Sequence, residues 1–140
     1  MKFSKLQMGI AAFFAVGTAA MGVAAQSETP EMLQSLERGL WQFRAVGGGA
    51  SPAGISQICV NDPRLLAQLK HNANSQCSHF VVRSSPSSVT ISYSCKGAGQ
   101  GLTTIRKESP RLIQIQSQGI QNGSPFSFSL EGRRSAACGT

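Results

Sequence analysis

The fold is decided by residues 78–95, which read SHFVVRSSPSSVTISYSC. Residues 80–83 carry the aromatic and β-branched side chains that favour a strand, and the SSPSS that follows them is typical of a turn. Beyond the turn, apolar and hydroxyl side chains alternate, which is the pattern of a strand with one buried face. Cys95 continues the apolar side, so we expect its sulfur to point into the core. The two sides of this strand are Val89, Ile91 and Tyr93, and Thr90, Ser92 and Ser94.

The same alternation recurs before and after this hairpin. Glycine- and proline-rich segments separate the alternating runs, and the Asn-Gly pair at 122–123 is a signal for a tight hairpin turn. About seven strands with short turns predict a mainly β protein, built as a curved antiparallel sheet or half-barrel, with a closed lipocalin-like barrel as the second choice. The predicted strands outside the first hairpin are 40–45, 55–60, 102–109, 111–119 and 126–132.

One segment has the pattern of a helix. Residues 61–74 read NDPRLLAQLKHNAN, in which Asn61 or Asp62 can cap the first turn and Pro63 suits the first helical position. The leucines of this segment form one apolar stripe at helical spacing. We therefore expect one short helix of two to three turns, packed against the sheet.

The first residues predict export. Lys2 and Lys5 precede an uncharged apolar run over 8–23, and small residues follow it, as in a secretory signal peptide cleaved between Ala25 and Gln26. The alternative is an uncleaved membrane anchor, but the run is shorter than the ~20 residues that a membrane-spanning helix needs. The predicted organisation is a signal peptide over 1–25, a polar linker or short helix over 26–38, and a single β-rich domain over 39–140.

Four cysteines lie beyond the predicted leader: Cys59, Cys77, Cys95 and Cys138. An even number in an exported chain predicts two disulfides, whereas a zinc site would need ligands in close pairs, which are missing here. Spacing leaves three pairings open. We prefer Cys59–Cys77 and Cys95–Cys138, because the second bond would hold the C-terminus against the sheet. The runner-up joins Cys77 to Cys95, which flank one predicted hairpin.

Charge is positive but dispersed. The chain has 13 lysines and arginines against 6 acidic residues, a formal net charge of +7, which falls to +5 once Lys2 and Lys5 leave with the leader. The basic residues form no run, and aromatic residues do not alternate with them, so nucleic acid is not an expected partner. A weak attraction to anionic surfaces is compatible with this charge.

An ordered set of short motifs resembles a known family. The set comprises Gly39-Leu40-Trp41, the SQICV of 56–60, Cys77, the YSC of 93–95, and Ala137-Cys138-Gly139. Together these motifs resemble the domain-of-unknown-function family 3617, whose members are small exported bacterial proteins, and the resemblance spans residues 37–139. It implies a periplasmic or secreted protein with a β-rich fold and a disulfide pattern, and it implies no activity.

Residues with catalytic chemistry are few. His71 and His79 are the only candidate general bases, and no serine lies in a G-x-S-x-G elbow. Trp41 is either a core residue or a platform on which a ligand stacks. We expect no cofactor and no metal. Two classes stay open: a non-catalytic module that binds an amphiphilic ligand or an envelope protein, and, as the alternative, an envelope enzyme or enzyme inhibitor.

Overall fold

A computed structural model describes residues 28–47, 52, 55–71 and 76–139. The predicted signal peptide and its cleavage site between Ala25 and Gln26 lie outside these residues. The elements in chain order are α1 (Glu31–Gln34), β1 (Gly39–Ala45), β2 (Gln57–Val60), the 3-10 helix η1 (Pro63–Gln68), β3 (Cys77–Ser84), β4 (Ser88–Cys95), β5 (Gly99–Ser109), β6 (Leu112–Gln121) and β7 (Ser124–Ala136).

The strands form one antiparallel sheet in the order β2-β1-β7-β6-β5-β4-β3. Strands β3 to β7 follow one another as neighbours, and β1 then pairs with β7 and carries β2 at the far edge. The described strands therefore leave two edges, β2 and β3. The predicted seven-stranded curved sheet is confirmed, and the second choice of a closed barrel is wrong.

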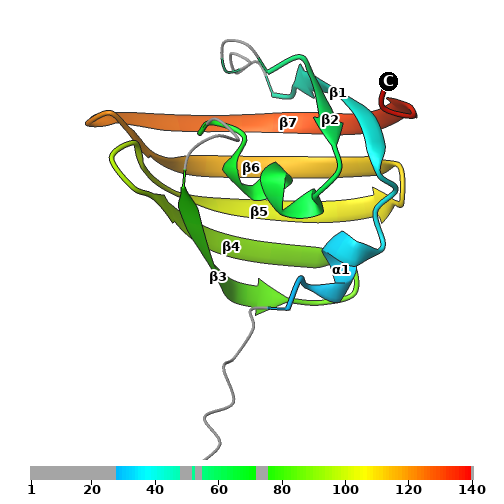
Figure 1. Ribbon diagram of the computed structural model, residues 1–140, viewed down its shortest axis with the longest axis horizontal. Coiled ribbons are helices and arrows are strands. Elements are labelled where there is room, and N and C mark those ends of the chain that lie inside the picture. Colours follow the sequence, from blue (N-terminus) through cyan, green and yellow to red (C-terminus); the bar gives the residue numbers. More distant parts are fainter. Residues whose placement is uncertain (1–27, 48–51, 53–54, 72–75, 140) are drawn as a thin grey trace, which may run out of the picture.

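The sheet curls around its own core. Figure 1 shows η1 and α1 over the same face of the sheet, which we call the inner face, and β1 and β2 curl across toward them. The inner positions of the strands are apolar, as the alternation in the sequence predicts, and they pack on Met32 and Leu33 of α1 and Leu66 of η1. The largest fully buried side chains are Trp41, Tyr93, Met32, Leu33, Leu66, Ile105, Ile113, Ile115 and Leu130.

The segment predicted as a polar linker or short helix, 26–38, is described from residue 28. It contains the single turn of α1, and Met32 and Leu33 are completely buried. Glu37 adds an ion pair to Arg111 at 3.2 Å. This part of the chain therefore covers the inner face of the sheet.

The short helix predicted within residues 61–74 is present, and it covers less of this segment than predicted. Its start is as expected, because Pro63 follows Asp62 and the Asp62 carboxylate accepts a hydrogen bond from the Arg64 N–H at 3.0 Å. The element is a 3-10 helix that ends at Gln68, and residues 72–74 of the prediction lie outside the described residues.

A side chain of the sheet explains why this helix is not α-helical. The Thr103 hydroxyl donates to the Ala67 carbonyl at 2.6 Å, and in an α-helix that carbonyl would accept from the N–H of residue 71. The His71 N–H instead donates to the Gln68 carbonyl at 2.9 Å, which is the 3-10 pattern. Tertiary contact with β5 thus overrides the helical pattern of the sequence.

The preferred disulfide pairing is wrong. The bonds are Cys59–Cys138 and Cys77–Cys95, so the runner-up pairing of Cys77 with Cys95 is right. Cys77 and Cys95 lie directly opposite each other on β3 and β4, with Cα atoms 4.0 Å apart. Cys59 lies opposite Leu40, the β1 residue that also pairs with Ala136 near the C-terminus. The last cysteine does hold the C-terminus, but against β2.

Candidate ligand site on the outer face of the sheet

The face of the sheet opposite η1 and α1, which we call the outer face, carries a shallow groove across four strands. The groove has a volume of about 630 Å³ and is lined by three consecutive residues from each of β4, β5, β6 and β7. These residues are Ser92, Tyr93, Ser94, Gln100, Gly101, Leu102, Gln118, Gly119, Ile120, Pro125, Phe126 and Ser127. We call this depression the outer groove.

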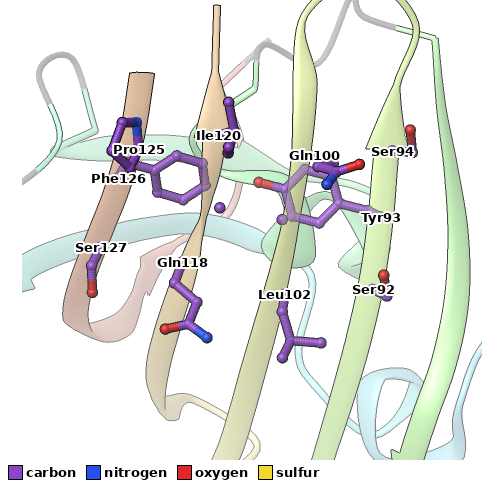
Figure 2. Close-up of a pocket in the computed structure, with 12 residues that line it drawn as sticks. Ser92, Tyr93, Ser94, Gln100, Leu102, Gln118, Ile120, Pro125, Phe126 and Ser127 are labelled. Carbon is purple, nitrogen blue, oxygen red and sulfur yellow. The ribbon is translucent and has the colours of Figure 1, made fainter. Parts of the chain in front are cut away.

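Strand register arranges the lining in two walls and a floor. One wall, the Ser94 row, consists of Ser94, Gln100, Ile120 and Pro125, and the other, the Ser92 row, consists of Ser92, Leu102, Gln118 and Ser127. Figure 2 shows the two rows in line across the strands, with the rings of Tyr93 and Phe126 between them. Because next-but-one residues on a strand are about 7 Å apart, the groove between the rows can accept a chain-like ligand.

The floor contains two glycines, and a side chain at either position would force neighbouring atoms to move. Gly101 and Gly119 are paired across β5 and β6 between Tyr93 and Phe126. A Cβ atom on Gly101 would lie 2.5 Å from the Tyr93 hydroxyl oxygen, and one on Gly119 would overlap the Gln100 carbonyl oxygen. The glycines therefore let the Tyr93 ring lie close against the sheet on its inner side.

A buried hydrogen-bonded network lies behind this floor. The Tyr93 hydroxyl is 2.9 Å from His71 Nδ1, and His71 Nε2 is 3.3 Å from the Ala98 carbonyl oxygen. A carbonyl only accepts, so Nε2 is the ring nitrogen that donates to Ala98. In the tautomer with its proton on Nε2, Nδ1 accepts from the Tyr93 hydroxyl. Tyr93 also bonds Ser117, whose hydroxyl is 2.7 Å from that of Thr103. The network joins η1 and the following residues to β4, β5 and β6.

Burial raises the pKa of Tyr93 to about 12, and the hydrogen bond with Ser117 opposes this shift. The hydroxyl is therefore protonated at neutral pH and serves as a hydrogen-bond donor. His71 is only 2 % exposed and contacts the rings of Tyr93 and Phe126 edge-on. These groups support the floor of the outer groove from inside the core.

His79 occupies a different environment. It lies on β3, and its buried Nε2 atom has no hydrogen-bond partner among the described residues. Burial lowers its pKa, the nearby Arg64 lowers it further, and Asp62 opposes both effects. The Asp62 carboxylate is itself held by the Arg64 guanidinium at 2.7 Å, which lowers the pKa of Asp62. The acidic group near His79 thus already has a cationic partner.

The predicted candidate bases are not brought into one open site. His71 is in the core, and among the described residues no acidic side chain is hydrogen-bonded to either histidine. A second, polar hollow of about 730 Å³ lies between the N-terminal segment and the start of η1, and its described lining contains neither histidine. Within the described ranges, no group of three histidine, cysteine or acidic residues could hold a metal ion.

Trp41 is a core residue. Its side chain is completely buried on the inner side of β1, and its indole N–H donates to the Glu37 carbonyl at 2.9 Å. Of the two sequence interpretations, the ligand platform is therefore excluded at this position. Its ring instead fixes the N-terminal segment against the sheet.

Charged groups on the outer face gather at the other end of the strands. Glu131 accepts from Arg44 at 2.9 Å, from Arg133 at 2.8 Å and from Gln114 at 3.2 Å. These hydrogen bonds lower the pKa of Glu131 to about 2. Arg106 pairs with Glu108 at 3.2 Å. The ion pairs thus lie away from the groove, whose lining has no charged side chain. The charged group nearest to it along β4 is Lys96, which lines an adjoining hollow together with Ser94, Gln100 and Ile120.

Sequence reasoning missed the groove, although one signal for it was present. Leu102 and Ile120 stand at outward positions, where the alternation calls for polar residues, and they are 38 % and 42 % exposed. An apolar residue at a position where the alternation of its strand calls for a polar one indicates an exposed contact surface. Their proximity on neighbouring strands depends on register, which the sequence alone does not specify.

No family model, no curated protein and no solved structure matches the chain. None of the helices in the described ranges has the length and apolar character required to cross a membrane.

Proposed function

We propose that this protein is an exported, non-catalytic binding module that holds an uncharged ligand in the outer groove. The observation that carries this proposal is the chemistry of the lining. Its described side chains combine apolar groups, such as Leu102 and Ile120, with hydroxyl and amide groups, and none of them has a formal charge. A ligand with charge would lose hydration in the groove without gaining a partner there.

The inner face of the sheet is a poorer candidate for ligand binding. A curved sheet suggests a ligand held in its hollow, as in a lipocalin, but that volume is filled by Trp41, Leu66 and Leu130, each at most 1 % exposed. A ligand would have to displace packed core side chains, at a cost of several kcal/mol. The outer groove requires no such change.

Catalysis is less well supported than binding. An enzyme of this size would need a base, acid or nucleophile in an open pocket. The only titratable group among the described groove residues is Tyr93, which stays protonated. The alternative of an envelope enzyme or inhibitor remains a prediction that no contact described above favours.

Export is the second part of the proposal. All four cysteines are paired in disulfides, which form and persist in oxidising compartments. The signal-peptide pattern and the resemblance to family 3617 favour the same location, the periplasm or the exterior. An intact-mass measurement tests it: we expect a chain that begins at Gln26 and has no alkylatable thiol before reduction. A retained leader or free thiols would contradict export.

Octyl β-glucoside is a suitable first probe for the groove, because it is uncharged and has both apolar and hydroxyl groups. Titrated below its micelle concentration, it should shift the side-chain amide NMR signals of Gln100 and Gln118. Leu102→Arg should abolish these shifts, since it adds a charge to the groove. Gln42→Arg adds the same charge at an exposed β1 position outside the groove and should preserve them. Shifts that are absent, or equal in both variants, would contradict the proposal.

A further inference from the structure

We propose that the ligand of the outer groove is a neutral glycan and that Phe80 is the platform on which one of its sugars stacks. This inference rests on the proposed function and names the ligand class. It is carried by three features: an exposed ring at the end of the groove, the arrangement of polar groups along the walls, and the placement of charge.

Phe80 is the most exposed large apolar side chain of the described residues, at 70 %. It lies on the edge strand β3 directly opposite Ser92, so it extends the Ser92 row by one strand. A phenyl ring with this much exposed surface lacks most of the burial that normally stabilises an aromatic side chain. Because the flat face of a sugar ring presents C–H groups, such a ring can stack on it and recover this burial.

The Ser92 row with Phe80 forms a line across five strands. Neighbouring strands are about 4.8 Å apart, so the line from Phe80 to Ser127 is about 19 Å long. Along it apolar and polar side chains alternate over the first four positions, Phe80, Ser92, Leu102 and Gln118, and the fifth, Ser127, is polar again. Each sugar of a linear oligosaccharide has apolar faces and polar hydroxyl groups, so it can contact both kinds of side chain. A chain of several sugars laid across the strands would contact each position in turn.

The polar groups of the walls favour a sugar over an acyl chain. Ser92, Ser94 and Ser127 offer hydroxyls, and Gln100 and Gln118 offer amides, each of which both donates and accepts. An acyl chain in the groove would bury these groups without partners, which is costly. Sugar hydroxyls also donate and accept, so they can satisfy the same groups.

The placement of charge favours a neutral glycan over an anionic one. Arg44, Arg106 and Arg133 lie away from the groove and already pair with Glu131 or Glu108. By register, the guanidinium nearest to the Ser92 row belongs to Arg83, which lies opposite Thr90, outside the groove lining. On the other side, Lys96 lines an adjoining hollow with Ser94, Gln100 and Ile120 but is not part of the groove lining. The groove lining itself therefore offers hydrogen bonds and no charged side chain.

The test uses three neutral tetrasaccharides, made of β-1,4-linked glucose, α-1,4-linked glucose and β-1,4-linked N-acetylglucosamine. A sugar-free alkyl probe, tetraethylene glycol monooctyl ether, is titrated in parallel below its micelle concentration. Binding to the purified protein is followed through the side-chain amide signals of Gln100 and Gln118. We expect at least one tetrasaccharide to shift these signals with saturation.

Variants on β3 separate stacking from general apolar contact. Phe80→Ala should weaken tetrasaccharide binding by about tenfold, as expected for the loss of one aromatic contact. Phe80→Tyr keeps the ring and should bind as the wild type does. Val82→Ala is the matched control, because Val82 is also exposed on β3, at 53 %, and stands at a bulge in the strand outside the groove lining. Thermal unfolding of each variant verifies that it is folded.

The outcomes distinguish this inference from the proposed function. Tetrasaccharide binding that Phe80→Ala weakens and Val82→Ala preserves would support both. If only the alkyl probe shifts the groove signals, the binding function stands and the glycan is overturned. Tetrasaccharide binding that Phe80→Ala leaves unchanged would overturn the role of Phe80. If no probe shifts the groove signals, both proposals are overturned.

Discussion

At the scale of single residues, Tyr93 links the core to the outer groove. Its ring lies against Gly101, which is part of the groove floor, and its hydroxyl connects His71 to Ser117 inside the core. A buried polar group is costly unless it is hydrogen-bonded, so every member of this network depends on the others. The alternation of residues 89–94 correctly predicts that Tyr93 faces inward. The network cannot be predicted from the sequence, because His71 and Ser117 join it only through the tertiary fold.

The first prediction concerns this hydroxyl. Tyr93→Phe should lower the free energy of unfolding by about 1–3 kcal/mol, because it leaves the buried His71 Nδ1 atom without its partner, while Ser117 keeps only its contact with Thr103. Thr90→Val is the control: it breaks a 3.0 Å contact with the Thr104 hydroxyl on the outer face, which is only half-buried. Its effect should stay below about 1 kcal/mol. Urea unfolding at pH 7 measures both, and equal stability of Tyr93→Phe and the wild type would contradict the network.

The same residue predicts an alkaline limit of stability. The pKa of Tyr93 is about 12 in the folded protein and near 10.0 when unperturbed, so the folded state holds this proton more tightly. Its contribution to stability is therefore complete below pH 10 and is lost as the pH rises from about 10 to about 12. Urea midpoints across this range should fall more steeply for the wild type than for Tyr93→Phe. Parallel pH profiles would argue against a buried hydroxyl.

Glu131 gives the corresponding prediction in acid. Its pKa is about 2 when folded and near 4.5 when unperturbed, so the unfolded chain takes up the proton first. Stability from this carboxylate is present above pH 5 and is lost as the pH falls toward 2. Glu131→Gln should be less stable than the wild type at pH 7, and the difference should vanish near pH 2. Glu108→Gln, which breaks an exposed ion pair, should change stability little at pH 7.

At the scale of elements, the strands were predictable, and the 3-10 form of the helix η1 was not. A strand can be predicted from the alternation of apolar and polar residues within its own sequence. This alternation is clear in β4, β6 and β7. The Asn122-Gly123 turn also follows from local chemistry, since both residues adopt the positive φ that this pair favours. The form of η1, in contrast, depends on the Thr103 hydroxyl of β5, which donates a hydrogen bond to the Ala67 carbonyl. No local pattern encodes that contact.

The glycine pair at the centre of β5 and β6 is tested at this scale. Gly119→Ala should destabilise the protein by about 1–3 kcal/mol, because the new methyl group would overlap the backbone of Gln100. Gly101→Ala should destabilise the protein less, since the new methyl group would meet the side chain of Tyr93, whose ring can shift, and not the backbone. Gly139→Ala, with no atom within 4 Å, is the control and should be neutral. Thermal unfolding ranks the three, and a neutral Gly119→Ala would contradict the register of β5 and β6.

At the scale of the whole molecule, each edge strand of the sheet carries one disulfide. Cys59 lies on β2 and Cys77 on β3, the two ends of the strand order. The preferred pairing assumed that Cys138 holds the C-terminus by bonding Cys95, whereas it bonds Cys59. The true partners are set by strand order, which brings β2 near the end of β7 and places β3 beside β4.

The two disulfides should contribute unequally to stability. In the chain-entropy account, the Cys59–Cys138 bond, with a sequence separation of 79, contributes about 4.5 kcal/mol, and the Cys77–Cys95 bond, with a separation of 18, about 3 kcal/mol. Paired substitution of both cysteines by serine leaves no free thiol, so each double variant isolates one bond. Denaturant unfolding should find Cys59→Ser/Cys138→Ser the less stable variant. The reverse order would contradict the account.

The candidate site was the least predictable feature of the molecule. Its residues come in groups of three from four strands, and none of the groups has a motif of its own. Strand predictions assigned Ser92 to the outward face and Phe126 to the inward face, but only the sheet register aligns the four groups into one groove. An uncharged lining also lacks the histidines and acidic residues by which a site is usually identified in a sequence.

The central claim is that ligand binds on the outer face of the sheet while the inner face stays closed. Methyl NMR of protein labelled at leucine and isoleucine tests it most directly, with the three tetrasaccharides and the alkyl probe titrated separately. We predict shifts at Leu102 and Ile120, which line the groove, and none at Ile105 or Ile113, which are fully buried on the inner face. Shifts at the methyl groups of Ile105 or Ile113 would contradict the account. So would the absence of shifts at Leu102 and Ile120 with every probe.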